Sequence, residues 1–230
     1  MDKETLINRL KAKQDLNLFI VEAIANTTFL NSLLEIVLTE TSSIKYVCTK
    51  IIRIVSEQKP ELIYPYFEDI VKWLHHKNSF IKWDGIITLS NLSTVDYEDK
   101  FMAIYQDYFA LIQGSQMITA NNVIGNAWKI VLAKPELETD ITRRLLDVPK
   151  IIYMNKGEPS PECNCIVCGQ VLGCFEHYFD LSGNQVAIVN FAEEQLGSCR
   201  KAVAKNAEKF LRLHSSKRYN PLNTGVSEVE

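Results

Sequence analysis

The stretch IKWDG at residues 81–85 opens a segment with helical periodicity, and related stretches lie on both sides of it at a constant distance. IKYVC begins 37 residues earlier, at residue 44, and ITANN begins 37 residues later, at residue 118. Two looser copies start near Glu162 and Ser198, at spacings of about 44 and 36 residues. Recurrence at this period is typical of repeat proteins, in which each unit buries its apolar face only by stacking on a neighbour.

Paired helices joined by short turns are predicted along most of the chain. Apolar side chains recur at helical spacing, and capping residues precede several of the segments. Pro65 lies inside one expected helix and predicts a kink there, because proline removes a backbone hydrogen bond. The expected helices cover residues 3–26 (one or two helices), 28–40, 43–57, 60–76, 79–92, 96–113, 116–133, 135–147, 162–179, 184–196 and 198–214.

Two series of residues fall at equivalent positions of the second helix in each pair and are predicted to be buried. Small residues at such positions let neighbouring helices pack closely. An aspartate in place of Ile87 is therefore expected to unfold the protein, because it would bury an unpaired carboxylate. The two series are Ile87, Ile124, Cys168 and Ala204, and Ser90, Ala127, Val171 and Ala207.

The composition fits a folded, all-α protein. The 230 residues are 47% hydrophobic and 23% charged, and only nine glycines and seven prolines occur, too few for the frequent turns of an all-β fold. Residues 1–214 are predicted to form a single helical domain, with residues 1–27 as its N-terminal helical cap. Residues 215–230 contain few apolar side chains and are expected to form a flexible tail.

The net charge of −3 gives the chain no overall field that would attract nucleic acid or an anionic membrane. The N-terminus lacks a signal-like apolar run, and no window of 18 apolar residues is present. We therefore expect a cytoplasmic protein that does not engage a membrane. Its six cysteines are then expected to be thiols.

The period near 37 residues and the paired helices resemble the HEAT and armadillo superfamily over residues 28–214. The resemblance implies an all-α, right-handed α–α superhelix, a solenoid of about five helix pairs. It also implies a non-enzymatic scaffold or adaptor that binds another protein along a concave surface, with no catalytic residue and no cofactor. Candidate binding residues at successive repeats are Lys45, Lys82, Asp84 and Asn121.

A cysteine cluster near residue 165 is the strongest chemical signal. Cys163, Cys165, Cys168 and Cys174 follow a C-x-C-x2-C-x5-C pattern, and thiolates suit zinc or an iron–sulfur cluster. Zinc sites usually use two cysteine pairs separated by a longer loop, whereas this stretch runs straight into a predicted helix. Packing of the cysteines as small hydrophobes is the favoured interpretation, and metal binding or redox sensing are the alternatives.

The last predicted helix carries a basic stripe. Lys201, Lys205, Lys209 and Arg212 recur at intervals of four and three residues and share one face, and the opposite face carries Val203, Ala207, Phe210 and His214. Such a stripe can bind phosphates or an acidic partner. The simpler interpretation is the solvated face of a terminal cap.

A second function class is nucleic-acid binding. Some bacterial DNA-alkylation-repair glycosylases have a HEAT-like fold and use tryptophans and an aspartate, and this chain is similar in offering Trp73, Trp83, Trp128 and Asp84. It lacks the dense arginine and lysine complement that DNA affinity requires. A protein partner is the favoured prediction. Nucleic-acid binding would weaken steeply with salt, whereas an interface with an apolar centre would not.

Overall fold

The computed structural model describes residues 3–12 and 14–214, so the tail expected at 215–230 lies outside the described residues. The fold is all-α, as predicted, and a two-stranded hairpin is the only sheet within the described part of the chain. The chain divides into two compact units, Met1–Glu138 and Thr139–Glu230.

Within residues 3–12 and 14–214, no single helix combines the length and apolar character needed to cross a membrane. Leu16–Ala25 and Thr27–Thr39 reach that length and composition only as a pair, and the pair is bent by 120°.

The helices of the N-terminal unit follow the predicted order with small shifts at their ends. They are α1 (Lys3–Lys11), α2 (Leu16–Ala25), α3 (Thr27–Thr39), α4 (Ile44–Gln58), α5 (Pro60–Ile63), α6 (Phe67–Val71), α7 (Ser79–Leu92), α8 (Lys100–Ala110) and α9 (Met117–Ala133). Helix α10 (Glu138–Leu146) begins at the boundary between the units.

Local side-chain chemistry explains where these helices begin and break. The Asn26 and Asn78 side chains accept hydrogen bonds from the first backbone N–H groups of α3 and α7. The predicted kink at Pro65 is a full break, because a 3-10 turn at Tyr64–Tyr66 separates α5 from α6. The asparagine caps and the proline thus set the ends of the paired helices.

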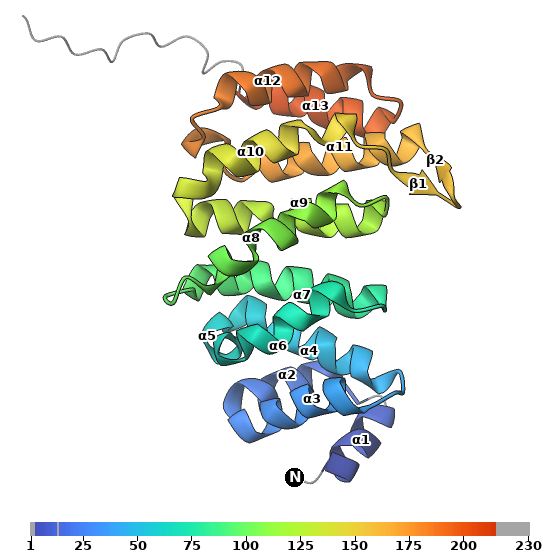
Figure 1. Ribbon diagram of the computed structural model, residues 1–230, viewed down its shortest axis with the longest axis vertical. Coiled ribbons are helices and arrows are strands. Elements are labelled where there is room, and N and C mark those ends of the chain that lie inside the picture. Colours follow the sequence, from blue (N-terminus) through green and yellow to red (C-terminus); the bar gives the residue numbers. More distant parts are fainter. Residues whose placement is uncertain (1–2, 13, 215–230) are drawn as a thin grey trace, which may run out of the picture. The chain divides into compact units, whose positions relative to one another are not determined.

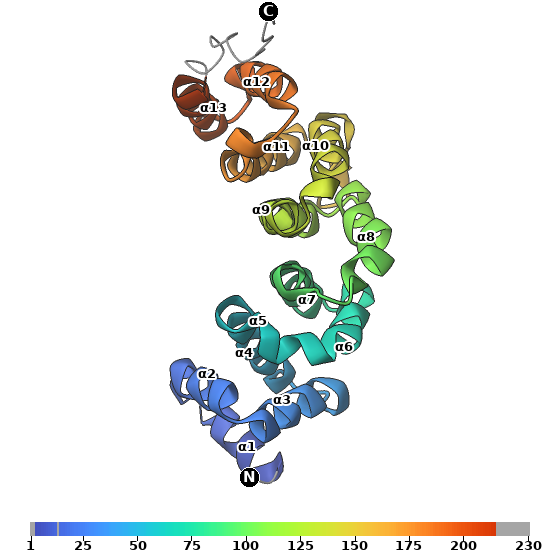
Figure 2. The same cartoon turned by 90° about the vertical axis from the view of Figure 1, so that its left-hand side faces the viewer.

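Helices α4, α7 and α9 pack side by side in one row of the N-terminal unit, and α6 and α8 lie in a second row, in front of the first in Figure 1 and to its right in Figure 2. Side-chain hydrogen bonds between neighbouring helices recur at sequence separations of 31–38 residues. Examples join Arg53 to Asp84, Ser56 to Asn91, and Asn91 to Lys129. These separations bracket the 37-residue period of the sequence.

The predicted buried series are confirmed in part. Ser90, Ala127, Val171 and Ala207 are all buried, and so are Ile124 and Cys168. The prediction that Ile87 and Ala204 are buried is wrong, because both residues are only partly buried. Ile87 is flanked by the fully buried Ile86, so the core-facing stripe of α7 is displaced by one residue from the predicted one. Because an aspartate side chain at position 87 would reach solvent, the Ile87→Asp substitution is not expected to unfold the protein.

The C-terminal unit contains α11 (Pro161–Glu176), α12 (Gln185–Glu194) and α13 (Lys201–His214). Between the helices predicted at 135–147 and 162–179, the chain forms a small hairpin in which β1 (Met154–Asn155) pairs antiparallel with β2 (Glu158–Pro159). Gly157 has a φ of 89° at the turn, a conformation that suits glycine. Tyr153, Phe175 and Tyr178 are among the largest fully buried side chains of this unit.

Asp96 connects three parts of the N-terminal unit and explains why α8 begins at Lys100 instead of residue 96. Its carboxylate accepts hydrogen bonds from the backbone N–H groups of Lys100 and Phe101, at 2.8 and 2.9 Å, and from the Tyr64 hydroxyl at 2.7 Å. The Lys134 ammonium lies 3.1 Å away, and the Asp96 side chain is fully buried. Burial alone would raise the pKa of Asp96, but these donors outweigh it and lower the pKa.

Substitution of Asp96 by Asn should destabilise the protein by about 3 kcal/mol at neutral pH, because Lys134 and two backbone donors lose a buried anion. A carboxyl group with a lowered folded pKa stabilises the fold above its unfolded pKa, near 4, and loses that effect as the pH falls through the folded value. Urea unfolding of both proteins across this range should show the difference shrinking with acidification. A constant difference would contradict this account.

Candidate functional site

We define the α4–α7–α9 face as the solvent-facing side of these three packed helices. Two clefts lie on it. The N-terminal halves of α4 and α7 and the start of α9 line one cleft, and residues near the C-terminal ends of all three helices line the other. The three helices therefore run in the same direction. The predicted binding residues Lys45, Lys82 and Asp84 belong to α4 and α7 of this group.

Asp84 joins α4 to α7. Its carboxylate accepts hydrogen bonds from the Thr49 hydroxyl at 2.7 Å and from Nε of Arg53 at 3.0 Å. The same guanidinium donates to Glu57 at 2.7 Å, so Arg53 bonds to both acidic side chains of α4 and α7. Burial raises the pKa of Asp84 more than the bonds to Thr49 and Arg53 lower it. Asp84 is therefore committed to contacts within the fold.

Three aromatic side chains surround the first cleft. The Phe80 ring lies 5.4 Å from Trp83 in an edge-to-face arrangement and 6.1 Å from Tyr46. Tyr46 accepts a hydrogen bond from Asn78, and the Trp83 indole donates to the Thr119 hydroxyl at 3.0 Å. Phe80 is 61% exposed, so it is the one large apolar ring of the three that projects into solvent.

We call this first site the phenylalanine cleft. Its volume is about 500 Å³. The lining combines aromatic, basic and amide side chains with one carboxylate, which suits an amphipathic ligand. The lining residues are Tyr46, Lys50, Arg53, Phe80, Trp83, Asp84, Ile87 and Asn122.

The second site, the lysine cleft, has a volume of about 550 Å³. Trp128 and the 43% exposed Leu132 form part of its wall, and Lys129 and Glu57 supply charges of opposite sign. The lining residues are Ser56, Glu57, Pro60, Asn91, Thr94, Trp128, Lys129, Leu132 and Ala133.

A chain of hydrogen bonds fixes Lys129 in the lysine cleft. Its ammonium group donates to the side-chain oxygens of Asn91 and Asn126, at 2.7 and 2.8 Å. Asn91 in turn donates to the Ser56 hydroxyl at 2.9 Å, which fixes the orientation of its amide. Both acceptors of Lys129 are neutral, and burial lowers the pKa of this lysine.

Charge is distributed unevenly over the molecule. Helices α4, α7 and α9 carry five basic and two acidic side chains, a net charge of +3, although the whole chain has a net charge of −3. Arg53 holds both acidic groups. Lys45, Lys50 and Lys82 make no salt bridge within the described residues. The face is thus locally basic, although the net charge of the whole chain is negative.

The structure brings three of the four predicted binding residues of the repeats into α4 and α7. Lys45 and Lys82 are partly buried, and the Lys45 ammonium lies 5.6 Å from the Tyr46 ring centre. Asn121 lies on α9, and its buried amide oxygen has no hydrogen-bond partner among the residues that the structure describes. The sequence reasoning missed Arg53 and Lys129. The sequence did offer a signal for both residues. Arg53 and Lys129 lie about one repeat length from Asp84 and Asn91, to which they are hydrogen-bonded.

Of the four residues that suggested DNA repair, only Trp83 and Asp84 share a site, the phenylalanine cleft. Trp73 is buried in the core, Trp83 is bonded to Thr119, and Trp128 lies in the lysine cleft. Asp84 is held by Thr49 and Arg53, which leaves it badly placed to act as a base.

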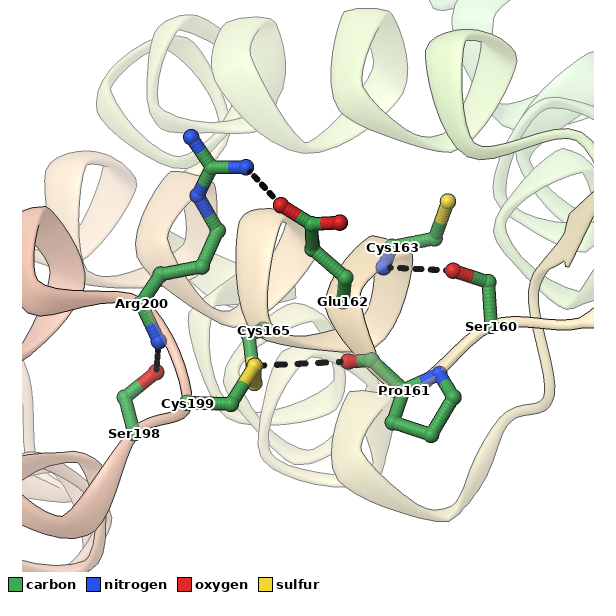
Figure 3. The surroundings of a disulfide bond; sticks show 8 residues. All are labelled: Ser160, Pro161, Glu162, Cys163, Cys165, Ser198, Cys199 and Arg200. Carbon is green, nitrogen blue, oxygen red and sulfur yellow. Dashed lines mark hydrogen bonds and ion pairs between the residues drawn. A yellow bond between two sulfur atoms is a disulfide. The ribbon is translucent and has the colours of Figure 1, made fainter.

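The cysteine stretch of the C-terminal unit contains a disulfide. Cys165 on α11 is bonded to Cys199, which precedes α13 (Figure 3). The expectation that all six cysteines are thiols is therefore wrong for these two, because the fold places residues 34 apart in sequence within bonding distance. Cys48, Cys163, Cys168 and Cys174 are free and buried, which agrees with a packing role.

The disulfide lies near the surface, with Cys199 exposed and Cys165 partly buried. Ser160 caps α11 by accepting a hydrogen bond from the Cys163 N–H, and Glu162 pairs with Arg200 at 2.5 Å (Figure 3). Cys199 Sγ lies 3.9 Å from the Pro161 carbonyl oxygen. This is a van der Waals contact, because a disulfide sulfur carries no hydrogen.

The four predicted metal candidates do not converge. The Cys163 sulfur points away from the disulfide (Figure 3), and Cys165 is not available as a thiolate. Within residues 3–12 and 14–214, no group of three or more His, Cys, Asp or Glu side chains has an arrangement that could hold a metal ion.

The predicted basic stripe lies on the exposed side of α13. Lys201, Lys205, Lys209 and Arg212 are exposed, while Val203, Ala207 and Phe210 are buried. Lys209 pairs with Glu176 at 3.2 Å, which partly neutralises the stripe. The helix phase was thus predicted correctly.

Comparison with known proteins gives no family for the chain. No protein-family model matches it, and no curated protein shows significant sequence similarity to it.

Replacing Arg53 by Met should lower the free energy of unfolding by about 2 kcal/mol, because Asp84 is left without its cation in a half-buried site. The loss should grow as the pH rises from about 4, since a carboxyl group with a raised folded pKa costs stability as it ionises. The double variant Arg53→Met/Asp84→Asn should recover much of the loss and its pH dependence. Urea unfolding measures all three proteins, and equal values for both variants would contradict the role of this pair.

Alkylation of the unfolded protein should modify four cysteines before reduction and six after it, because Cys165 and Cys199 are oxidised. Peptide mapping without reductant should recover the cross-linked pair. Elemental analysis of the same sample tests the metal alternative. Six reactive thiols, or one zinc or iron per chain, would show that the cysteine site is not as described.

Proposed function

We propose that the protein is a non-enzymatic scaffold or adaptor that binds another protein through the α4–α7–α9 face of a HEAT-like helical solenoid. The main support for the proposal is the exposed ring of Phe80, which lies beside a cleft of this face. Hydrogen bonds between neighbouring helices hold the face in place. Aromatic residues, phenylalanine included, are enriched at the centres of protein interfaces, where a few anchor residues supply most of the binding energy.

The repeat architecture supports this proposal. Hydrogen bonds between neighbouring helices recur at separations of 31–38 residues, close to the period of the sequence. Solenoids present extended surfaces from equivalent positions of successive repeats. A cytoplasmic location and the right-handed superhelix remain predictions from the sequence.

Nucleic-acid binding is the second candidate, and the exposed stripe of α13 favours it. Lys201, Lys205 and Arg212 make no salt bridge within the described residues. However, Lys209 is paired with Glu176, and phosphate contacts must be numerous to give useful affinity. The protein partner therefore remains the preferred proposal.

Replacing Phe80 by Asp should reduce recovery of captured proteins by roughly tenfold or more, because the variant removes an aromatic anchor. The bait is the full chain, and quantitative mass spectrometry compares proteins captured from extract of the source cell. The matched control is Met102→Asp, because Met102 is 41% exposed on α8 in the second row of helices. The control should capture the same proteins as the unmodified chain.

Circular dichroism and thermal unfolding must first show that both variants are folded. Equal capture by Phe80→Asp and the control would contradict the proposed surface. Capture that disappears after nuclease treatment, or falls in a Lys201→Gln/Lys205→Gln variant, would favour the nucleic-acid alternative.

A further inference from the structure

The helices that bear the exposed ring of Phe80 and its cleft also carry three lysines. Lys45 and Lys50 lie on α4 and Lys82 on α7, and none makes a salt bridge within the described residues. Lys50 lines the phenylalanine cleft together with Phe80. This end of the face therefore combines unneutralised positive charge with an exposed apolar surface.

The acidic side chains of the same helices do not compensate these lysines. Asp84 and Glu57 are the only carboxylates of α4, α7 and α9, and both are bonded to Arg53. Lys45 is the second residue of α4, and Lys82 the fourth of α7, near the positive ends of the helix dipoles. Cations at these positions destabilise a helix, so the fold does not explain their placement.

The positive charge continues into the lysine cleft. Lys129 is held by two neutral amides, with its charge not neutralised by a directly bonded carboxylate. Its pKa is lowered by burial, which is the expected effect on a cation that lacks such a partner. Seven residues separate Asn122, in the phenylalanine cleft, from Lys129 on α9, or roughly 10 Å along the helix.

We propose that the face binds an extended, acidic segment of a partner protein, with an apolar side chain in the phenylalanine cleft and a carboxylate that reaches Lys129. This inference rests on the proposed protein-binding function and names the chemistry of the partner. Roughly three residues of extended chain span the 10 Å between the clefts. A carboxylate flanking the apolar residue would lie close to Lys50, which lines this cleft.

A protein segment fits this face better than a nucleic acid does. The only arginine of the three helices is already bonded to two carboxylates, so no guanidinium is left for bidentate contact with phosphate. Tyr46 and Trp83 are held by hydrogen bonds, and Phe80 alone offers an exposed ring, whereas nucleic-acid strands need successive stacking platforms.

Fluorescence anisotropy with a defined probe tests the inference without the natural partner. The probe is a fluorescein-labelled peptide of about ten residues in which Glu alternates with Gly around one central Leu. Matched peptides replace every Glu by Gln, or the Leu by Gly, and an oligothymidine of similar length represents nucleic acid. The acidic peptide should bind the full chain at least roughly tenfold more tightly than either matched peptide.

Two protein variants locate the binding. Lys50→Gln and Lys129→Gln should each weaken binding of the acidic peptide several-fold. The control Lys72→Gln/Lys156→Gln removes two exposed lysines outside the face and should leave the affinity unchanged. Unchanged affinity in either face variant, equal binding of the Gln peptide, or tighter binding of the oligothymidine would overturn the inference.

This experiment separates the inference from the function on which it rests. If the acidic peptide does not bind but protein capture still depends on Phe80, the scaffold function stands and the acidic partner is wrong. If capture is also independent of Phe80, both proposals fail.

Discussion

The two bonds of Arg53 determine the character of the α4–α7–α9 face. One guanidinium holds Asp84 on the next helix and Glu57 on its own helix. Because both acidic groups of the three helices are occupied in this way, the remaining lysines confer a local positive charge on a chain that is acidic overall. The same bond fixes α4 against α7, so the electrostatics and the packing of the face depend on one side chain.

A second polar connection extends this order to α9. Ser56, Asn91 and Lys129 form a continuous series of hydrogen bonds across the three helices. Buried polar groups of this kind tolerate few alternative arrangements, because an unpaired partner costs free energy in a low-dielectric interior. The series therefore specifies how the helices align, while the surrounding apolar residues supply most of the driving force for packing.

The sequence predicted the fold class and most helix ends, because periodicity and capping are local properties. The bounds of α7, 79–92, and the exposed face of α13 were both predicted correctly from neighbouring residues. Ile87 was misplaced because a helix phase error of one residue moves a side chain by about 100°. The Cys165–Cys199 disulfide was missed because pairing across 34 residues depends on how two helices pack, which spacing alone does not reveal.

The contacts between neighbouring helices also bear on how the chain folds. The cross-helix hydrogen bonds of the face join residues at most 38 apart, and the disulfide closes a loop of similar length. Each contact therefore needs only a short loop to close, and the entropy lost in closure grows slowly with loop length. Topologies of low contact order fold rapidly, so a helix and its immediate neighbours can form a nucleus before the rest of the chain is ordered.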